Sequence, residues 1–460
     1  MAERERAVLV GVQLPGMDAA EHEASMAELG RLVHTLGYDV VGEVTQRRDR
    51  LAPSSVLGEG KLVELASWSG GRGVVPMGPP RRVVTKAREK WEAEIDDGPA
   101  PDAIAEEDEE VESAPRESRR ADLVVVDHEL SPSQARNLGR ATGIEVLDRT
   151  GVIVEIFHRH AQSREARLQV EIARLNYLVP RMRATGGGDR QRGGIGGKGA
   201  GESALELDRR KVRDRVAQLR GELAAIESEQ TTRRARRTDQ LRVALVGYTN
   251  AGKSSLMRAL TGSDVLVADK LFATLDTTVR ALHPESVPRV LVSDTVGFIK
   301  KLPHDLVASF RSTLDEALEA SLLLLVVDAS DPTFRQQLAV TQEVLGEIGA
   351  DEVPAQLVLN KIDRVDPEGR EILRAEFPTA LQLSAKDRGD VARLREHILR
   401  TFDGALAEAE LFLPWENAGL LGDVHAHTRV VEERHEGDGI HLKIKGRPAE
   451  VARILAKHRG

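Results

Sequence analysis

Cysteine is absent from this chain of 460 residues, and aromatic residues make up only 3% of it. The absence of cysteine excludes disulfide bonds and thiolate metal sites. The longest apolar run, Leu322 to Val327, ends at Asp328 and is far shorter than the roughly 20 residues of a membrane-spanning helix. The first residues also lack the apolar region of a signal peptide. We therefore expect a cytoplasmic protein with no membrane span.

Charge is unevenly distributed along the chain. The net charge of −9 argues by itself against a nucleic-acid partner. Residues 91–115 hold eleven Asp or Glu and no Lys or Arg, which is typical of a disordered acidic insert and which we place at about 78–120. Residues 159–237 hold nineteen Lys or Arg against ten Asp or Glu. This second segment predicts a polyanion-binding surface, and a solvated helix face is the alternative.

A glycine-containing loop follows an apolar run in the middle of the chain. Residues 247–254 fit the pattern G-x-x-x-x-G-K-[ST], and residues 241–246 before them predict a strand. In such a loop, backbone N–H groups surround phosphates, and the N-terminus of the next helix adds partial positive charge. The pattern predicts a nucleoside triphosphate site made of Gly247, Tyr248, Thr249, Asn250, Ala251, Gly252, Lys253 and Ser254.

Three further motifs come downstream, each after a strand-like run. They are Asp294-Thr295-Val296-Gly297 after residues 289–293, Asn360-Lys361-Ile362-Asp363 after 355–359, and Ser384-Ala385-Lys386 after 380–383. This order predicts a GTP hydrolase.

Each phosphate-site position has a chemical role. Lys253 is expected to reach the β- and γ-phosphates, and the Ser254 hydroxyl to coordinate Mg²⁺. Asp294 ends a strand, where its carboxylate can hold the Mg²⁺ shell through water. Gly297 offers its N–H to the γ-phosphate. We therefore expect a magnesium-dependent reaction.

The base site distinguishes guanine from adenine. The Asp363 carboxylate can accept two hydrogen bonds from N1–H and N2–H₂ of guanine, which adenine cannot donate. Asn360 can bridge the base and the phosphate loop, and the Lys361 stem can cover the ring face. The backbone of Ser384 and Ala385 can approach the base carbonyl. The nucleotide is therefore expected to be GTP or GDP.

The N-terminal part alternates between strand and helix patterns. Residues 6–14, 39–46 and 121–127 are expected to be strands, and residues 19–36, 60–67 and 131–142 carry helical spacing. A small parallel α/β domain follows from this order. Gly58-Glu59-Gly60-Lys61 is a much weaker second candidate for a phosphate loop, and an ATPase in this domain would rest on it alone.

The basic segment carries two apolar stripes with helical spacing. Leu168, Ile172, Leu175 and Val179 form the first, and residues 212, 216, 219, 223 and 226 form the second. Nine glycines among residues 186–201 prevent a continuous helix, so we expect an antiparallel hairpin with a Gly-rich tip. A mere linker is the alternative. The cations at the tip, which we expect to bind RNA phosphates, are Arg181, Arg183, Arg190, Arg192 and Lys198.

Several segments of the sequence occur together in one known protein family. The Gly-rich run 192–202 precedes residues 205–210, and the phosphate loop precedes 271–276 and 294–299; residues 147–150, 169–177 and 302–306 extend the match. Together they closely resemble the HflX family of ribosome-associated GTPases, over nearly the whole chain. The sequence departs from that family at Thr277 and Ala200, where a proline is common, and the acidic insert has no counterpart.

The resemblance implies a first switch made of Phe272, Ala273, Thr274, Leu275 and Asp276, in which Thr274 is a direct Mg²⁺ ligand that senses the γ-phosphate. It also implies binding to the large (50S) ribosomal subunit, with the hairpin near the peptidyl-transferase rRNA, and the splitting of stalled ribosomes under stress. Lys253, Thr274 and Gly297 would be the catalytic residues. We expect a monomer.

Phe298 occupies the position at which Ras-type enzymes carry a glutamine that orients the attacking water. Intrinsic hydrolysis is therefore expected to be slow. Asn250 lies where potassium-activated GTPases that resemble this one carry a cation-binding Asn, which makes K⁺ a second candidate cofactor. The rival function is a GTP-gated protein-interaction switch that does not act on ribosomes.

The expected fold class is α/β. A P-loop GTPase domain (238–403) is preceded by a small parallel α/β domain (1–160) and an antiparallel helical hairpin (161–237). It is followed by a small α+β C-terminal domain (404–460), which the resemblance implies.

Overall fold

The structure is a computed structural model that describes residues 5–75, 120–181, 204–234, 240–262, 271–272, 278–300 and 316–458. The acidic insert, the Gly-rich tip, the segment 302–306 and most of the expected first switch lie outside these ranges. The described residues up to 226 belong to one compact unit, and those from 227 onward belong to a second. The expected GTPase and C-terminal domains thus share one unit.

The N-terminal domain is built on a parallel sheet of four strands, in the order β2-β1-β3-β4. The three expected strands are β1 (Arg6–Gln13), β2 (Asp39–Arg47) and β3 (Leu123–Val126), and the additional edge strand is β4 (Glu145–Asp148). β1 and β3 are almost wholly apolar because both faces of the sheet are covered.

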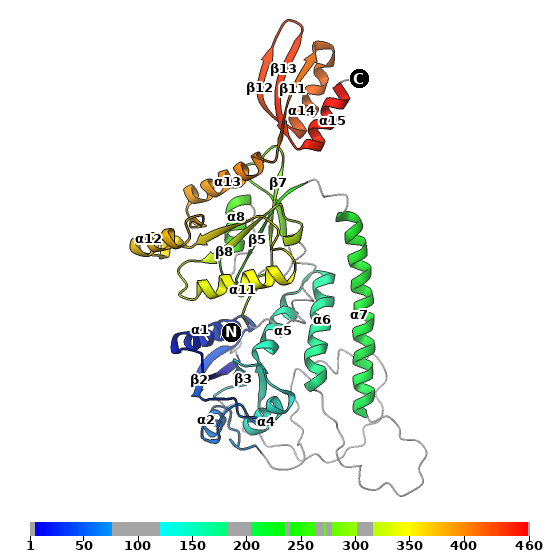
Figure 1. The fold of residues 1–460 in the computed structure, drawn as a ribbon. Helices are drawn as coiled ribbons and strands as arrows, with labels where there is room; N and C mark the ends of the chain where they lie inside the picture. Colours follow the sequence, from blue (N-terminus) through cyan, green and yellow to red (C-terminus); the bar gives the residue numbers. More distant parts are fainter. Residues whose placement is uncertain are drawn as a thin grey trace. The chain divides into compact units, whose positions relative to one another are not determined.

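Helices cover both faces of this sheet. Figure 1 shows α1 (Ala19–Leu36) and α5 (Arg149–His160) on one face, and α2 (Glu59–Ser69) and α4 (Pro132–Thr142) on the other. α4 begins with a capping box, in which the Ser131 side chain accepts from the Gln134 N–H and the Gln134 side chain accepts in return.

The helical hairpin forms as expected. α6 (Arg164–Leu178) is followed by a 3₁₀ turn, η2 (Val179–Arg181), and the second helix is α7 (Ala204–Arg234). The ion pairs Arg164–Glu222 and Glu171–Arg215 show that the helices run antiparallel. The predicted stripes pack against each other as a single apolar cluster of Leu168, Ile172, Leu175, Val212, Val216 and Leu219.

The second unit contains a six-stranded sheet in the order β10-β9-β8-β5-β7-β6, in which only β6 is antiparallel to its neighbour. Figure 1 shows α11 (Phe334–Glu347) on one face, and α8 (Lys253–Thr261) and α13 (Arg388–Asp403) on the other. α12 (Pro367–Glu376) lies between β9 and β10 in the chain. The strands are β5 (Leu241–Gly247), β6 (Thr278–Ala281), β7 (Val290–Asp294), β8 (Leu322–Asp328), β9 (Ala355–Asn360) and β10 (Leu381–Gln382).

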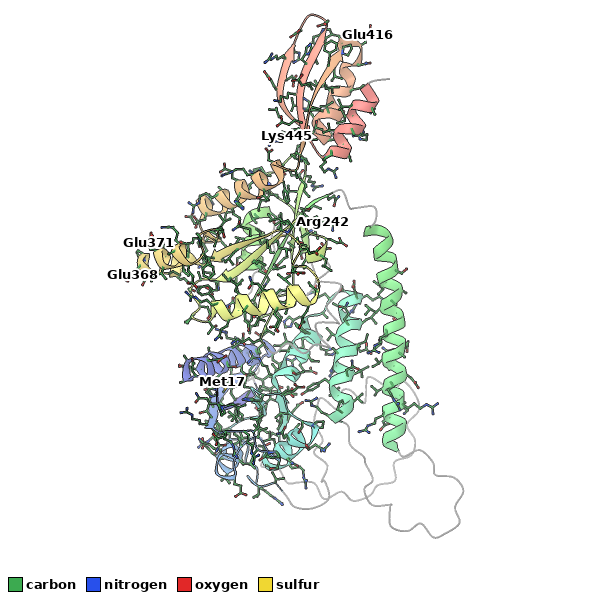
Figure 2. All side chains as sticks on the ribbon, viewed as in Figure 1. Met17, Arg242, Glu368, Glu371, Glu416 and Lys445 are labelled. Carbon is green, nitrogen blue, oxygen red and sulfur yellow. The ribbon has the colours of Figure 1, made fainter. Side chains whose placement is uncertain are left out.

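The C-terminal domain is α+β, as expected. Its antiparallel sheet has the order β11-β13-β12. Lys445, on β13, donates to the Asp403 carboxylate at the end of α13 over 2.6 Å, and Figure 2 labels it where the two domains meet. The elements are β11 (Ala407–Pro414), η4 (Trp415–Leu420), α14 (Leu421–His427), β12 (Arg429–His435), β13 (Gly439–Gly446) and α15 (Pro448–His458).

Glu145 opens the edge strand β4 in a partly buried position. Burial raises its pKa to about 7, and the negative charges of Glu155 and Glu5 add to the effect, while Arg159 and Arg174 oppose it. The folded protein therefore holds this proton more tightly than the unfolded chain does. The resulting stabilisation is complete below the unfolded pKa of 4.5 and is lost as the pH rises through about 7.

We expect Glu145→Gln to remove this pH dependence, because the amide stays neutral. Between pH 5.5 and 8 the free energy of unfolding of the N-terminal domain should fall by up to about 2 kcal/mol more in the parent than in the variant. Urea unfolding followed by Trp68 fluorescence, with Trp91 and Trp415 replaced by phenylalanine, measures it. Glu64→Gln, at an exposed position of α2, should keep the parental dependence of the free energy of unfolding on pH. The same pH dependence in all three proteins would contradict the expectation.

Candidate functional site

The predicted phosphate loop lies at the carboxyl end of β5, between that strand and α8. Gly247 has φ +150°, and a Cβ there would lie 2.1 Å from the carbonyl oxygen of Val326 on β8. Gly252 has φ +96°, and a Cβ there would lie 2.3 Å from Asn360 Nδ2. Both positions therefore require glycine, because no side chain fits the space or the backbone conformation. The loop backbone therefore lies close to β8 at Gly247 and close to Asn360 at Gly252.

Lys253 is buried at the start of α8. Its Nζ donates to the carbonyl oxygens of Gly247 and Tyr248 over 3.0 and 2.9 Å. Burial lowers the pKa of Lys253 to about 8, and the negative charge of Asp294 opposes that shift. A phosphate beside the ammonium would stabilise its charged form, so the site suits an anion.

Two oxygen ligands of the kind that Mg²⁺ prefers meet next to the loop. The Ser254 hydroxyl donates to Asp294 Oδ2 over 2.7 Å, and Asp294 is fully buried at the end of β7. Hydroxyl and carboxylate oxygens fit a hard divalent cation. Thr274, the third expected ligand, lies outside the described residues together with Ala273, Leu275 and Asp276. Phe272 is described and is buried, with φ +58°.

The side chain of Thr249 supports the same assignment. It is 7% exposed, and its Oγ1 has no hydrogen-bond partner among the residues that the structure describes. A buried hydroxyl without a partner is costly, and a phosphate oxygen in the loop would accept its proton. The residues present therefore fit a bound nucleotide phosphate.

The second-switch motif begins beside the loop. A Cβ on Gly297 would lie 2.8 Å from Thr249 Cα and 3.0 Å from Lys253 Nζ, so this position also requires glycine. Phe298 is 2% exposed, and its side chain has no hydrogen-bonding group. Thr295 Oγ1 donates to the Leu245 carbonyl over 2.7 Å and thereby ties β7 to β5. Val296 is buried as well.

Asn360 joins the base-reading loops to the phosphate loop. Its Nδ2 donates to the Ala251 carbonyl over 2.8 Å, and its Oδ1 accepts from the Ala385 N–H over 3.1 Å. Lys361 Nζ donates to the Asn250 carbonyl over 2.8 Å and to Asp328 Oδ2 over 2.7 Å. The structure thus brings together three motifs that are far apart in the sequence.

Asp363 is exposed and lies on a short 3₁₀ turn, η3 (Ile362–Arg364). A hydrogen bond from the Ser384 side chain lowers the pKa of Asp363, and the positive charges of Lys386 and Arg364 lower it further. The carboxylate therefore stays ionised near neutral pH and can accept hydrogen bonds from a base.

Sequence reasoning missed one residue at this site and one contact. Asp328, which had no expected role, ends β8 and binds Lys361. Tyr248, expected in the phosphate loop, also contributes a side-chain hydroxyl that accepts from the Lys300 N–H over 2.7 Å. The signal for Asp328 was available, because it is a carboxylate directly after the longest apolar run, at the end of a parallel strand. The Tyr248 contact spans 52 residues and has no local signal.

Arg181, one of the cations expected to bind RNA, has partners within the protein. Its NH2 donates to Asp148 Oδ2 over 2.7 Å and to the Leu130 carbonyl over 3.0 Å, and its guanidinium stacks on the Tyr177 ring. Asp148 is fully buried, and its Oδ1 accepts from the Tyr177 hydroxyl. Arg181 thus anchors the hairpin to the N-terminal domain. The other tip cations, Arg183, Arg190, Arg192 and Lys198, lie outside the described residues.

The weaker candidate loop at residues 58–61 is used within the protein. Gly58 N–H donates to Gln46 Oε1 over 2.9 Å, and Lys61 pairs with Glu64 over 2.7 Å. Neither contact points to a bound phosphate.

Comparison with protein families matches three consecutive parts of the chain. Residues 23–74 and 106–158 match the family described as GTP-binding GTPase N-terminal, and residues 160–237 match GTP-binding GTPase Middle Region. Residues 242–361 match the family described as 50S ribosome-binding GTPase.

A GTPase HflX from Gluconacetobacter diazotrophicus is 60% identical over 450 residues, which cover 97% of this chain and 96% of the relative. The chain belongs to the HflX family of GTPases. The GTPase HflX of Escherichia coli is 41% identical over 324 residues, 69% of this chain and 76% of that one. As a family member, the chain binds GTP and hydrolyses it.

Among solved structures, a GTP-binding protein from Sulfolobus solfataricus in complex with GDP is 23% identical. The match covers 86% of this chain and 98% of that one, with a TM-score of 0.42. Within the described ranges, no helix is long and apolar enough to cross a membrane.

We expect Asp363→Asn to weaken GTP binding by roughly 100-fold, because two charge-assisted hydrogen bonds to guanine are lost. Affinity for xanthosine triphosphate should rise, since its extra carbonyl accepts from the new amide. Competition titrations with both nucleotides measure the change. Asp351→Asn, an exposed carboxylate at the other end of β9, serves as the control. A folded Asp363→Asn protein that keeps the parental preference for GTP would refute the assignment.

We expect Arg181→Met to destabilise the N-terminal unit by about 2–3 kcal/mol, because a buried carboxylate loses its cation but keeps other donors. Urea unfolding followed by Trp68 fluorescence gives the value. Arg164→Met, which breaks an exposed ion pair with Glu222, should cost less than about 1 kcal/mol. Equal effects of the two substitutions would show that Arg181 is not an anchor.

Proposed function

We propose that this GTPase binds the large (50S) ribosomal subunit when it carries GTP, and that it splits stalled ribosomes in the cytoplasm under stress. The match of residues 242–361 to a 50S ribosome-binding GTPase family carries the proposal. The excess of cations in residues 159–237 supports an RNA target, here the rRNA near the peptidyl-transferase centre. The protein acts as a monomer.

The reaction is proposed to need Mg²⁺, held directly by Ser254 and Thr274 and through water by Asp294. The cation would neutralise charge that develops on the phosphates. Lys253 binds the β- and γ-phosphate oxygens and orients them, and Gly297 donates its N–H to the γ-phosphate. Asp363, Asn360 and Ala385 hold guanine, which fixes the other end of the nucleotide.

The attacking water lacks a side chain to orient it, because Phe298 replaces the glutamine of Ras-type enzymes. Hydrolysis by the free protein is therefore slow, and the ribosome helps to orient the attacking water. K⁺ bound at Asn250 would add positive charge beside the phosphates, in addition to that of Mg²⁺. Asn250 has φ +60°, and its own carbonyl accepts from Lys361, so its side chain is the part that would meet a cation.

We expect binding to large subunits to depend on GTP and to fall steeply with salt, because cations at the tip release counterions from rRNA phosphates. Cosedimentation with a non-hydrolysable GTP analogue, at several salt concentrations, measures both. Replacing Arg183, Arg190, Arg192 and Lys198 by alanine should weaken binding and make the salt dependence shallower.

The matched control replaces four exposed arginines of the second unit, each paired with a nearby acid: Arg289, Arg374, Arg393 and Arg400. This control variant should bind large subunits as the parent does. If the variant with the four tip cations replaced binds and splits ribosomes like the parent, the tip is only a connector. If the parent does not bind subunits at all, the protein-interaction switch becomes the better account.

We expect GTP turnover to be faster in K⁺ than in Na⁺ at equal ionic strength. Asn250→Gly should abolish the difference, and glycine keeps the positive φ that alanine would strain. Phosphate release assays in the two salts measure it. Equal rates in both salts for the parent would exclude a role for K⁺.

A further inference from the structure

The first residues of the second switch pair with the phosphate loop through their backbone. Tyr248 and Phe298 form an isolated parallel bridge. The Phe298 N–H donates to the Gly247 carbonyl over 3.1 Å, and the Thr249 N–H donates to the Phe298 carbonyl over 2.7 Å. The backbone of Phe298 thus binds the phosphate loop, although its side chain has no hydrogen-bonding group.

The side chain of Tyr248 adds a second attachment. It is 3% exposed, and its hydroxyl oxygen accepts from the Lys300 N–H over 2.7 Å. The segment 297–300 is therefore held to the loop at two points, Phe298 and Lys300. Ile299, between them, is 1% exposed, so packing restricts the same segment.

Tyr248 also touches the phosphate-binding lysine. Its carbonyl accepts from Lys253 Nζ over 2.9 Å. One residue therefore contacts both the cation that binds phosphate and the segment that follows Gly297.

We propose that the Tyr248 hydroxyl is a positioning group, which fixes the second switch so that the Gly297 N–H meets the γ-phosphate. The inference rests on the proposed role of Gly297. The side chain at position 298 cannot hydrogen-bond to the nucleotide or to water. The segment is positioned by its backbone contacts, by the packing of Ile299, by the Lys300 side chain, which donates to Gln336, and by this hydroxyl. Without the hydroxyl, this link between the Lys300 N–H and the loop is lost, and the segment samples positions away from the γ-phosphate more often.

The test is Tyr248→Phe in the full-length protein, which keeps the ring and removes only the hydroxyl. Affinities for GDP and for a non-hydrolysable GTP analogue are measured by fluorescence titration with Mg²⁺. GDP has no γ-phosphate, so its affinity should stay within about twofold, while affinity for the GTP analogue should fall about five- to tenfold. Amide hydrogen exchange at Lys300 should accelerate.

Ser293→Ala is the matched control. It removes a buried hydroxyl from β7 that donates to the Val243 carbonyl over 3.4 Å, and it should leave the ratio of the two affinities unchanged. An unchanged ratio in Tyr248→Phe, or an equal loss for both nucleotides, would overturn the proposal. Hydrogen exchange at the Gly297 amide separates the two assumptions. If the GTP analogue does not protect this amide more than GDP does in the parent, the assignment of Gly297 is wrong. If the protection is equal in the parent and in Tyr248→Phe, Tyr248 does not position the switch.

Discussion

The phosphate loop leaves β5 so close to β8 that no side chain fits at Gly247, and the remainder of the nucleotide site depends on this approach. Carbonyl oxygens repel phosphate, and the protein satisfies four of them with its own donors. Lys253 binds the carbonyls of Gly247 and Tyr248, Lys361 binds that of Asn250, and Asn360 binds that of Ala251. Asn360 and Lys361 belong to the base-reading motif, so phosphate and base recognition form one connected network.

The basic hairpin shows that charge alone does not assign a residue to a ligand. Arg181 is one of the cations whose excess favours RNA binding. Its guanidinium, however, pairs with the buried Asp148 carboxylate and stacks on the Tyr177 ring. A buried Asp148 needs a cation, because an unpaired charge in the interior is costly. The anchor joins the first helix of the hairpin to the sheet, and that role is structural.

Sequence reasoning was sufficient where local signals were strong. Strands β1, β2 and β3, the antiparallel hairpin and the ordered nucleotide motifs all follow from periodicity and spacing. It missed β4 (Glu145–Asp148), whose four mixed residues carry no alternation or apolar run. Contacts such as Tyr248 with Lys300 join residues 52 positions apart, and only the folded sheet brings them together. Whether a cation is exposed or anchored, as at Arg181, is likewise decided by tertiary packing.

Phe298 stands where a glutamine would orient the attacking water, so we expect this GTPase to hydrolyse GTP efficiently only on the large ribosomal subunit that we propose as its partner. Single-turnover hydrolysis, with protein in excess over GTP and with or without purified large subunits, tests it most directly. We expect a rate at least about tenfold higher with large subunits, equivalent to ~1.4 kcal/mol of barrier, and no such increase with small subunits. The same rate in the presence and absence of large subunits would contradict it.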